Sequence, residues 1–398
     1  MRNSFAAFPI SALAAVALLS ACSNGGSQGS NSALPNTGVS QSRALARSDA
    51  FPDAGAEFAY EANEGSTNVS AYKIAGDGAL TPVKGSPFNA GSNPSGVAVD
   101  PSGKFAYASN AGSANVSAFT IDASSGALKQ LKGSPFAGGT SPSGIAVDSS
   151  GKFAFVANVG QSSNSNVSAF SIGSSGALTA VKGSPFAAGT SAQYIATDPS
   201  GKFVYVPNAG SDNVSAYKIG SNGALAPVKG SPFAAGSAAF GIGIDPKGKF
   251  AYVSNNGAGN VSAYAINASS GALTAVKGSP FASGAGPCSI VVDPNGKFVF
   301  VPNLSSGNVY AYKIASSGAL TLIKGSPFAA GSGACYGAVD PSDKFLYVGN
   351  SNVGTISAYQ IGSSGALTPI KGSPFTAGST PAVIATCRVT NGKCVPST

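Results

Sequence analysis

Short stretches in which large apolar residues alternate with small or polar ones recur along most of this chain. One such stretch is Phe105–Ser109, and the segment NVSAFTI at 115–121 follows it. Alternation with a period of two residues is typical of β-strands. A short apolar run at 96–99 precedes these two stretches, and another at 127–131 follows them. The pattern therefore predicts four antiparallel strands in sequence order.

The segment Asp100-Pro101-Ser102-Gly103-Lys104 separates the first two of these strands and predicts a turn. Aspartate begins such turns by accepting hydrogen bonds from backbone NH groups. Proline presets φ at the next position, and glycine allows φ above zero. The first two strands are therefore expected to form a hairpin.

The whole pattern repeats, and the pentapeptide KGSPF marks its period. Seven copies lie 47 to 50 residues apart, beginning at Lys84, Lys132, Lys182, Lys229, Lys277, Lys324 and Lys371. This period suits a four-stranded propeller blade, and seven copies imply seven blades. The predicted fold is therefore all-β, a seven-bladed β-propeller.

The two ends of the chain are expected to share one blade. The second strand occurs seven times, whereas the innermost strand occurs only six times, before Asp100, Asp148, Asp198, Asp245, Asp293 and Asp340. The segment before Phe58 is a poor strand, but Val383–Thr386 matches the inner-strand segment Ile195–Thr197. The C-terminal strand is thus predicted to join the N-terminal blade, which leaves no unpaired edge in the ring.

The composition agrees with this fold and disfavours several functions. Only 10% of the 398 residues are charged, 53 are glycine, and there is no histidine. The net charge of +8 comes largely from lysines at repeated positions, and charges spread around a ring make a weak footprint for nucleic acid. The lack of histidine disfavours a haem or copper electron-transfer propeller. We expect no cofactor, no nucleic-acid partner and a monomeric ring.

The N-terminal segment is typical of an exported lipoprotein. Arg2 precedes the apolar stretch Phe5–Leu19, and Leu19-Ser20-Ala21-Cys22 resembles a bacterial lipobox, in which the cysteine is acylated. Ser23 resembles the residue that follows the cysteine in lipoproteins sorted to the outer membrane. We therefore expect a lipid-anchored protein of the cell envelope, at the outer membrane rather than the inner one. An ordinary secreted protein with an incidental Cys22 is the alternative.

The stretch after Cys22 is rich in serine, glycine and asparagine and shows no apolar periodicity, which is typical of a flexible tether. We therefore divide the chain into three parts. These are a lipoprotein signal peptide at 1–21, the tether at 22–50 and the propeller at 51–398.

Four cysteines remain after Cys22, an even number that suits disulfides in an oxidising compartment. Cys387 and Cys394 flank a turn-like segment, so a bridge between them would pin the closing strand. Cys288 and Cys335 hold equivalent places in adjacent blades and would pair if their Cα atoms lie within about 7 Å. Both bridges are predicted. A metal site of cysteines alone is less favoured because no histidine accompanies them, and we expect no metal.

The unit NPSGVAVDPSGKFAYASNAGSANVSAFTIDASSGALKQLKGSPF resembles the repeat of the lactonase-like seven-bladed propellers, which include bacterial 6-phosphogluconolactonases. The resemblance covers about residues 53–395 and agrees in strand order, turn motif and blade count. It implies a lactone hydrolase whose polar and charged groups, including His and Arg, act at the channel mouth. This chain has no histidine, and Arg388 is the only arginine of its propeller region. No catalytic residue can therefore be transferred by position.

Departures from the repeat indicate a candidate ligand site. Ligands of propellers usually bind at the face formed by the loops entering the inner strands and by the turns after the second strands. At or just before the inner strands, where other units have Ser-Gly, this chain has Tyr194, Phe240 and Tyr336. All three fall on that face and together suggest a pocket. Drift in the repeat, or local plugging of the channel, explains them equally well.

Asn63 belongs to a ring of asparagines that end the second strands: Asn63, Asn110, Asn158, Asn208, Asn255, Asn303 and Asn350. Asparagine often bonds the backbone of its own turn. The alternative is a ring of amides that binds a carbohydrate or peptide. Glu61 and Glu64 flank Asn63, and no other unit has two acids there. They are the candidate general bases of a hydrolase.

Two functions follow from these observations. The near-uniform repeat, and the lack of a nucleophile with a base beside it, favour a lipid-anchored, non-catalytic scaffold that binds a glycan, a peptide or an envelope protein. The family resemblance implies the alternative, a lactonase-type hydrolase with a histidine-free site at the channel mouth.

Overall fold

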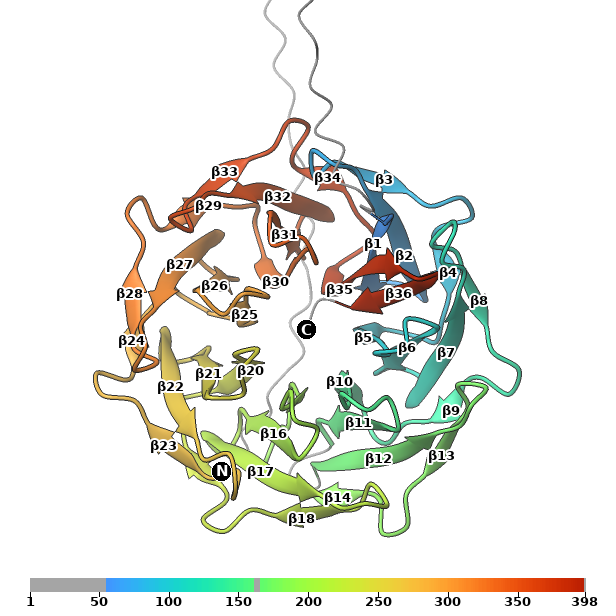
Figure 1. Ribbon diagram of the computed structural model, residues 1–398, viewed down its shortest axis with the longest axis horizontal. Coiled ribbons are helices and arrows are strands. Elements are labelled where there is room, and N and C mark those ends of the chain that lie inside the picture. The colour runs from blue at the N-terminus through green and yellow to red at the C-terminus, as the bar shows by residue number, and fades with distance from the viewer. Residues whose placement is uncertain (1–54, 161–164, 397–398) are drawn as a thin grey trace, which may run out of the picture. The chain divides into compact units, whose positions relative to one another are not determined.

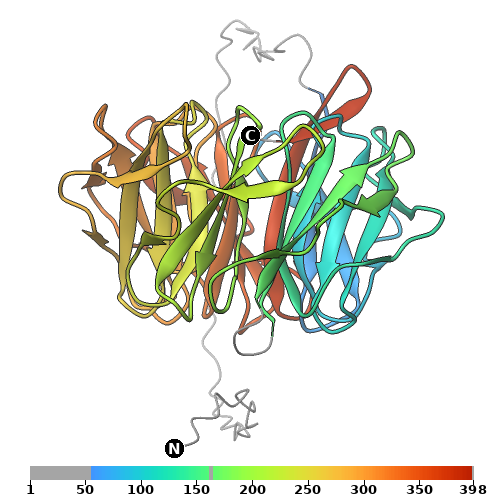
Figure 2. The same cartoon turned by 90° about the horizontal axis from the view of Figure 1, so that it is seen from below.

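The computed structural model describes residues 55–160 and 165–396. These residues form 36 strands in seven sheets around a central axis (Figure 1). Figure 2 shows the ring from the side, with the strands of each blade running between its two faces. The predicted seven-bladed propeller is confirmed, whereas the expected signal peptide and tether lie outside the described residues. Within the described part, no helix is long and apolar enough to cross a membrane.

Each blade contains the four predicted strands. The innermost strands are β5 (Pro94–Val99), β10 (Pro142–Val147), β15 (Ala196–Thr197), β20 (Ala239–Ile244), β25 (Val291–Val292), β30 (Ala334–Val339) and β35 (Pro381–Thr390). The second strands are β1 (Glu57–Asn63), β6 (Phe105–Asn110), β11 (Phe153–Asn158), β16 (Phe203–Asn208), β21 (Phe250–Asn255), β26 (Phe298–Asn303) and β31 (Phe345–Asn350). Consecutive strands pair antiparallel, as in the order β5-β6-β7-β8.

The outer part of each blade follows the same plan. The third strands are β2 (Asn68–Ile74), β7 (Asn115–Ile121), β12 (Asn166–Ile172), β17 (Asn213–Ile219), β22 (Asn260–Ile266), β27 (Asn308–Ile314) and β32 (Thr355–Ile361). The fourth strands are β3 (Leu80–Pro82), β8 (Leu128–Gln130), β13 (Leu178–Ala180), β18 (Leu225–Pro227), β23 (Leu273–Ala275), β28 (Leu320–Leu322) and β33 (Leu367–Pro369).

A short fifth strand, which the sequence pattern did not predict, follows each fourth strand. These strands are β4 (Phe88–Asn89), β9 (Phe136–Ala137), β14 (Phe186–Ala187), β19 (Phe233–Ala234), β24 (Phe281–Ala282), β29 (Phe328–Ala329) and β34 (Phe375–Thr376). Each begins at the phenylalanine of KGSPF and pairs with the third strand. The serine of KGSPF supports this pairing, since Ser134 Oγ accepts a hydrogen bond from the Ala118 NH at 2.9 Å.

The ring closes as predicted. β35 pairs along the second strand β1, so the first and last parts of the chain share one sheet. An unpredicted strand, β36 (Lys393–Pro396), pairs with the other edge of β35. Asn391 and Gly392 join them with φ of 51° and 70°, the two positive values that a tight two-residue hairpin requires.

The Asp-Pro turns have the predicted geometry and define one face of the ring, here called the turn face. Asp100 Oδ1 accepts hydrogen bonds from the NH groups of Lys104 at 2.9 Å and Phe105 at 2.7 Å. The opposite face, here called the loop face, contains the loops entering the inner strands and the asparagine turns. Both faces are thus fixed by the repeat.

The core lies between neighbouring blades. Seven clusters of buried apolar residues fill the seven gaps between adjacent sheets. Buried tyrosines of the second strands add hydrogen bonds to a neighbouring blade. Tyr347 Oη, for example, donates to the Gly78 carbonyl at 2.9 Å and so joins the last blade to the first.

Candidate functional site

The seven asparagines of the loop face lie inside the blades and are fully buried. Asn63 Nδ2 donates to Asn68 Oδ1 at 2.7 Å and to Ser70 Oγ at 2.9 Å. Each asparagine also packs beneath a glycine of the loop entering an inner strand, and Asn63 leaves no room for a Cβ at Gly378. The amide nitrogen of Asn63 is therefore already used within its blade, and the site described below is built without it.

The three aromatic departures meet at the axis of the ring. The ring centroid of Tyr194 lies 5.4 Å from that of Phe240 and 5.7 Å from that of Tyr336. These residues come from three different blades, so side chains that contact one another must extend toward the axis. The structure thus brings together three residues that are 142 positions apart at most (336 − 194) in the sequence.

Tyr194 and Tyr336 occupy one position of the repeat, four residues before the turn aspartate. A cavity of about 150 Å³ adjoins both tyrosines. Five of the residues that line it occupy this same position in their own blades: Tyr194, Gly241, Ser289, Tyr336 and Val383. Ser289 and Val383 were not among the residues predicted from the sequence. Their alignment with the two tyrosines in the repeat is the signal that could have found them.

Glu64 is half-buried, and its charge acts on both tyrosines. Burial raises the pKa of Glu64 above its ordinary value. Burial also raises the pKa of Tyr194, and the neighbouring Tyr336 phenol and Glu64 carboxylate raise it further. The Tyr194 hydroxyl is buried, and its polar neighbour is the Tyr336 hydroxyl. This group of residues, here called the Glu64–tyrosine cluster, places a proton acceptor near two phenol hydroxyls.

Glu61 has a different environment. Its side chain is fully buried in β1, and its Oε2 accepts a hydrogen bond from Tyr72 Oη at 3.1 Å. Burial raises the pKa of Glu61 to about 8, although the Tyr72 hydroxyl and the Gly378 NH act in the opposite direction. The equivalent residues of the other blades are small or apolar: Ala108, Val156, Val206, Val253, Val301 and Val348. Of the two candidate bases, only Glu64 is partly open to solvent, and only its charge raises the pKa of Tyr194 and Tyr336.

Both predicted disulfides are confirmed. Cys288 and Cys335 are bonded with their Cα atoms 4.9 Å apart, and Cys387 and Cys394 with theirs 5.3 Å apart. The first bond joins two adjacent blades directly beside Tyr336. There the backbone NH and Oγ of Ser289 also donate to the Cys335 carbonyl, at 3.1 and 2.9 Å. These contacts fix the inner strand that carries Tyr336.

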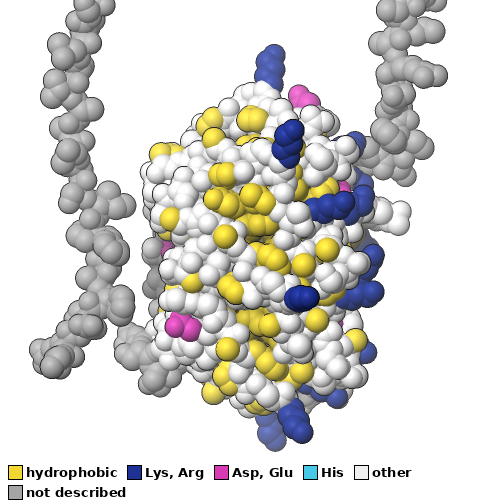
Figure 3. Space-filling model, turned by 90° about the vertical axis from the view of Figure 1, so that its left-hand side faces the viewer, with side chains coloured by type: hydrophobic (Ala, Val, Ile, Leu, Met, Phe, Trp, Pro, Cys, Tyr) yellow, Lys and Arg dark blue, Asp and Glu magenta, His cyan; other side chains and the backbone are white. Residues whose placement is uncertain are grey.

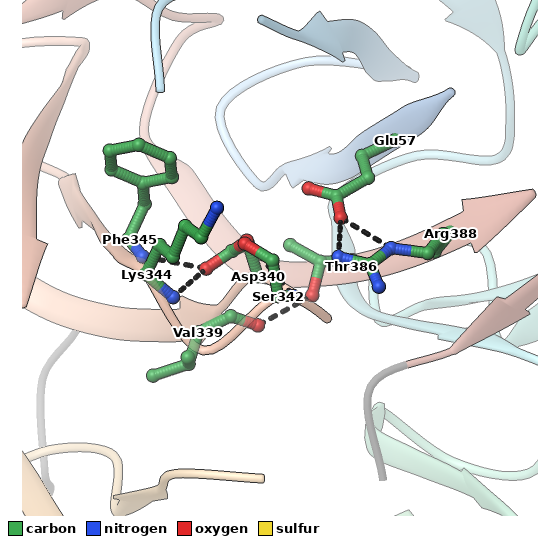
Figure 4. A network of polar contacts seen from close by, with 8 residues as sticks. All are labelled: Glu57, Val339, Asp340, Ser342, Lys344, Phe345, Thr386 and Arg388. Carbon is green, nitrogen blue, oxygen red and sulfur yellow. Dashed lines mark hydrogen bonds and ion pairs between the residues drawn. The ribbon is translucent and has the colours of Figure 1, made fainter. Parts of the chain in front are cut away.

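The single arginine of the propeller lies at the turn face, away from the Glu64–tyrosine cluster. Arg388 Nε donates to Glu57 Oε1 at 2.7 Å (Figure 4), at the opposite end of β1 from Asn63. The described loops of the loop face contain no lysine or arginine. In Figure 3 the lysines lie in the right-hand half of the view, and none lies along its left-hand edge. The cluster therefore has no cationic side chain in the loops around it.

A second, larger cavity lies on the axis toward the turn face. Its volume is about 500 Å³, and residues of all seven inner strands line it, together with turn prolines such as Pro101 and Pro199. Its lining is mostly alanine, valine, isoleucine and proline. It contains no acid–base pair comparable to the Glu64–tyrosine cluster.

Comparison with known proteins assigns the repeat to a family. A family model described as a lactonase with a seven-bladed β-propeller matches residues 42–192 and 229–336. No curated protein matches the sequence.

Solved structures with the same fold cover most of the chain. A candidate 6-phosphogluconolactonase from Bacteroides fragilis is 22% identical with a TM-score of 0.71, over 84% of this chain and 98% of its own. The periplasmic gluconolactonase of Pseudomonas aeruginosa is 18% identical with a TM-score of 0.71, over 84% and 100%. A protein of unknown function from Desulfotomaculum acetoxidans is 17% identical with a TM-score of 0.68, over 84% and 99%. At these identities the similarity shows the shared fold.

Proposed function

The chain belongs to the lactonase family of seven-bladed β-propellers, and we propose that it hydrolyses small lactones at the Glu64–tyrosine cluster. This reverses the order of the two functions drawn from the sequence, in which the binding scaffold came first. The family match and the names of two similar structures support the hydrolase. The observation that carries the proposal is the half-buried Glu64 carboxyl group acting on two phenols at the channel mouth.

Each group of the cluster has a role in this reaction. The Glu64 carboxylate takes a proton from a water molecule while the water oxygen attacks the lactone carbonyl carbon. Negative charge then develops on the carbonyl oxygen, and the Tyr194 hydroxyl donates a hydrogen bond to it. The bond between the carbonyl carbon and the ring oxygen breaks, and the ring oxygen takes the proton from Glu64. The product is an open-chain hydroxy acid.

The surroundings of the cluster favour an uncharged lactone over a phosphorylated one. The adjoining cavity of about 150 Å³ is smaller than the roughly 300–1,000 Å³ of typical ligand pockets, which suits a small ring. A phosphate group needs arginine, lysine or a row of free NH groups. The described loops of this face supply no cation, and the Glu64 carboxylate would repel an anion.

The test follows proton release from the full chain over a panel of lactones. The panel includes glucono-δ-lactone, γ-butyrolactone, an acyl homoserine lactone and 6-phosphogluconolactone. We expect turnover of an uncharged member and a loss of about 10²- to 10⁴-fold in Glu64→Gln, the usual contribution of a general base. Asp212→Asn is the matched control, because Asp212 is an exposed acid on the same face. No turnover of any lactone, or full activity in Glu64→Gln, would contradict the proposal.

A binding propeller is the second candidate, and the aromatic rings around Tyr194 favour it. Three neighbouring aromatic side chains at a channel mouth can stack on the apolar face of a sugar. If no lactone is hydrolysed, glycan arrays and envelope peptides become the ligands to test. Loss of binding in Tyr194→Ala and Tyr336→Ala would then support this second function.

We also propose that the protein is exported and anchored to the outer membrane through acylated Cys22. That residue lies outside the described part of the chain, and the support comes from the lipobox and from the two disulfides, which suit an oxidising compartment. Metabolic labelling with an alkyne fatty acid should mark the wild type but not Cys22→Ala. Labelling of both proteins, or of neither, would contradict the anchor.

A further inference from the structure

One of the turns that begin with an aspartate differs from the others in its hydrogen bonds. At Asp100, Asp148, Asp198 and Asp340, the Oδ2 atom accepts from a serine two residues later. In the turn between β25 and β26, asparagine replaces this serine. The Oδ2 atom of Asp293 has no hydrogen-bond partner among the described residues, although the side chain is 0% exposed. A buried carboxylate oxygen is therefore left without a donor.

The next turn, between β30 and β31, contains a second departure. Asp343 takes the place that glycine has in the other such turns: Gly103, Gly151, Gly201, Gly248 and Gly296. It has φ of 59°, which favours glycine. Its Oδ2 atom accepts a hydrogen bond from the Asn295 amide, and its Oδ1 atom is buried without a hydrogen-bond partner. Glycine at this position would have avoided both the strained φ and a second, half-buried carboxylate.

These two carboxylates face each other across neighbouring blades. Burial, followed by the charge of Asp343, raises the pKa of Asp293 to about 6. Burial also raises the pKa of Asp343, and the charge of Asp340 adds to this effect, whereas hydrogen bonds with the Asn295 amide and with the Asp293 carboxyl group lower it. The Lys297 ammonium acts in the opposite direction on both groups. The two turns therefore hold three carboxylates, Asp293, Asp340 and Asp343, and two lysines, Lys297 and Lys344, which leaves an excess of one negative charge.

Asp340, unlike Asp293 and Asp343, accepts hydrogen bonds at both of its carboxylate oxygens. Its Oδ1 atom accepts hydrogen bonds from the NH groups of Lys344 and Phe345 at 2.8 and 2.6 Å (Figure 4). Its Oδ2 atom accepts from Ser342. Among the three carboxylates of these two turns, only Asp293 and Asp343 have a buried oxygen without a hydrogen-bond donor.

We propose that Asp293 Oδ2 and Asp343 Oδ1 bind a Ca²⁺ ion between these two turns. Carboxylate oxygens are the ligands that hard divalent cations prefer, and Ca²⁺ accepts water molecules at its remaining positions. No group of three Asp, Glu, Cys or His side chains that could hold a metal occurs in the described part of the chain, so two carboxylates carry this site. The expectation of no metal rested on thiolate and imidazole ligands alone.

A bound cation accounts for both departures at once. Two neighbouring carboxylates, here the buried Asp293 and the half-buried Asp343, repel each other unless a proton or a cation lies between them. The Lys297 side chain is exposed, and it does not remove the rise in either aspartate pKa. A Ca²⁺ ion would satisfy both free oxygens and link two blades at the turn face.

The test compares the full-length protein with Asp343→Gly, which restores the glycine of the other turns. After treatment with EGTA, both proteins are titrated with CaCl₂ up to about 10 mM, a range that includes the weak sites of extracellular modules. Calorimetry counts the bound ions, and thermal unfolding gives Tm. We expect one Ca²⁺ per wild-type chain and a saturable rise in Tm of about 3 °C, because a ligand that binds only the folded state stabilises it. Asp343→Gly should bind no ion and show no rise.

Further outcomes distinguish the alternatives. Asp343→Asn keeps the strained φ but removes the charge, so it too should lose binding. Absence of Ca²⁺ binding by the wild type would overturn the site. The same Tm response in Asp343→Gly would place the ion elsewhere and also overturn it. A wild-type Tm that rises on acidification but not with Ca²⁺ would show a shared proton instead.

Discussion

Two glutamates three residues apart, Glu61 and Glu64, show how burial separates groups of identical chemistry. The pKa of Glu64 is raised by burial, but its side chain is only half-buried. As a general base it acts in its ionised form. We therefore expect kcat/KM to fall as the pH is lowered through this raised pKa and to level off at higher pH. A pH profile between 4 and 9 checks this, and a flat profile would contradict the role of Glu64.

Glu61 leads to a prediction about stability. Its pKa is about 8 in the folded protein, against an ordinary value of 4.5. The folded state thus binds a proton more tightly, so this contribution to stability is full below pH 4.5 and is lost as the pH rises toward 8. The expected slope is about 1.4 kcal/mol per pH unit within this window. Glu61→Gln, which cannot ionise, should show a smaller fall between pH 5 and 8.

Chemical unfolding at several pH values measures the difference between the two proteins. Other buried acids, such as Glu57 and Asp293, titrate in both and cancel in the comparison. Parallel pH curves for wild type and Glu61→Gln would show that Glu61 is already ionised at pH 5 in the folded state.

The sequence could not rank these two glutamates, and the reason is physical. In a sheet with one wet face, strand alternation separates buried from exposed residues. Both faces of a blade pack against neighbouring blades here, so alternation gave no solvent side for Glu61. Similarly, Asn63 repeats in every blade and Tyr194 departs from the repeat, and the sequence did not show which of the two belongs to a binding site. Only the packing showed that the Asn63 amide nitrogen is used inside its blade, whereas the Tyr194 ring lies against aromatic rings of two other blades.

At the scale of elements, the two disulfides should differ in their effect on stability. Cys288 and Cys335 are 47 residues apart, and Cys387 and Cys394 only 7. In the chain-entropy account, longer loops give larger stabilisation, about 4 kcal/mol for the first and about 2.5 kcal/mol for the second. Replacing each pair by alanine and measuring the free energy of unfolding checks this order. An equal or reversed order would mean that contacts in the folded state dominate.

Most elements could be predicted because the repeat supplied seven copies of each signal. The turn aspartates, the third strands and the closing strand all followed from counting. The short strands such as β9 were missed because two residues, Phe136 and Ala137, are too few to show a period. β36 was missed because it occurs once, so no repeat supported it. Its Asn391-Gly392 turn was visible in the sequence, but the pairing partner was not.

At the scale of the whole molecule, a closed ring makes each blade depend on its two neighbours. The loop face and the turn face carry different departures from the repeat: the Glu64–tyrosine cluster on one, and the Asp293–Asp343 pair on the other. Both depend on residues from more than one blade. Correct closure is therefore a condition for either proposed site.

Closure itself depends on β35, and this gives a prediction. A chain ending at Ser379 would lose the inner strand of the shared blade and leave β1 with an unpaired edge. It would also lose the buried side chains Ala382 and Ile384. We expect a loss of about 5 kcal/mol or more, together with association through the free edge. Size-exclusion chromatography with light scattering, alongside thermal unfolding, measures both effects.

A matched control separates β35 from β36. A chain ending at Thr390, with Cys387→Ala, keeps all of β35 but lacks the β36 hairpin. It should remain monomeric, because β1 keeps its partner and only the edge of β35 that faces the axis is uncovered. If both truncated chains aggregate, β36 is needed for closure as well. If the chain ending at Ser379 stays monomeric with the wild-type Tm, the ring does not depend on the shared blade, and its stability must come from the packing between the other six blades.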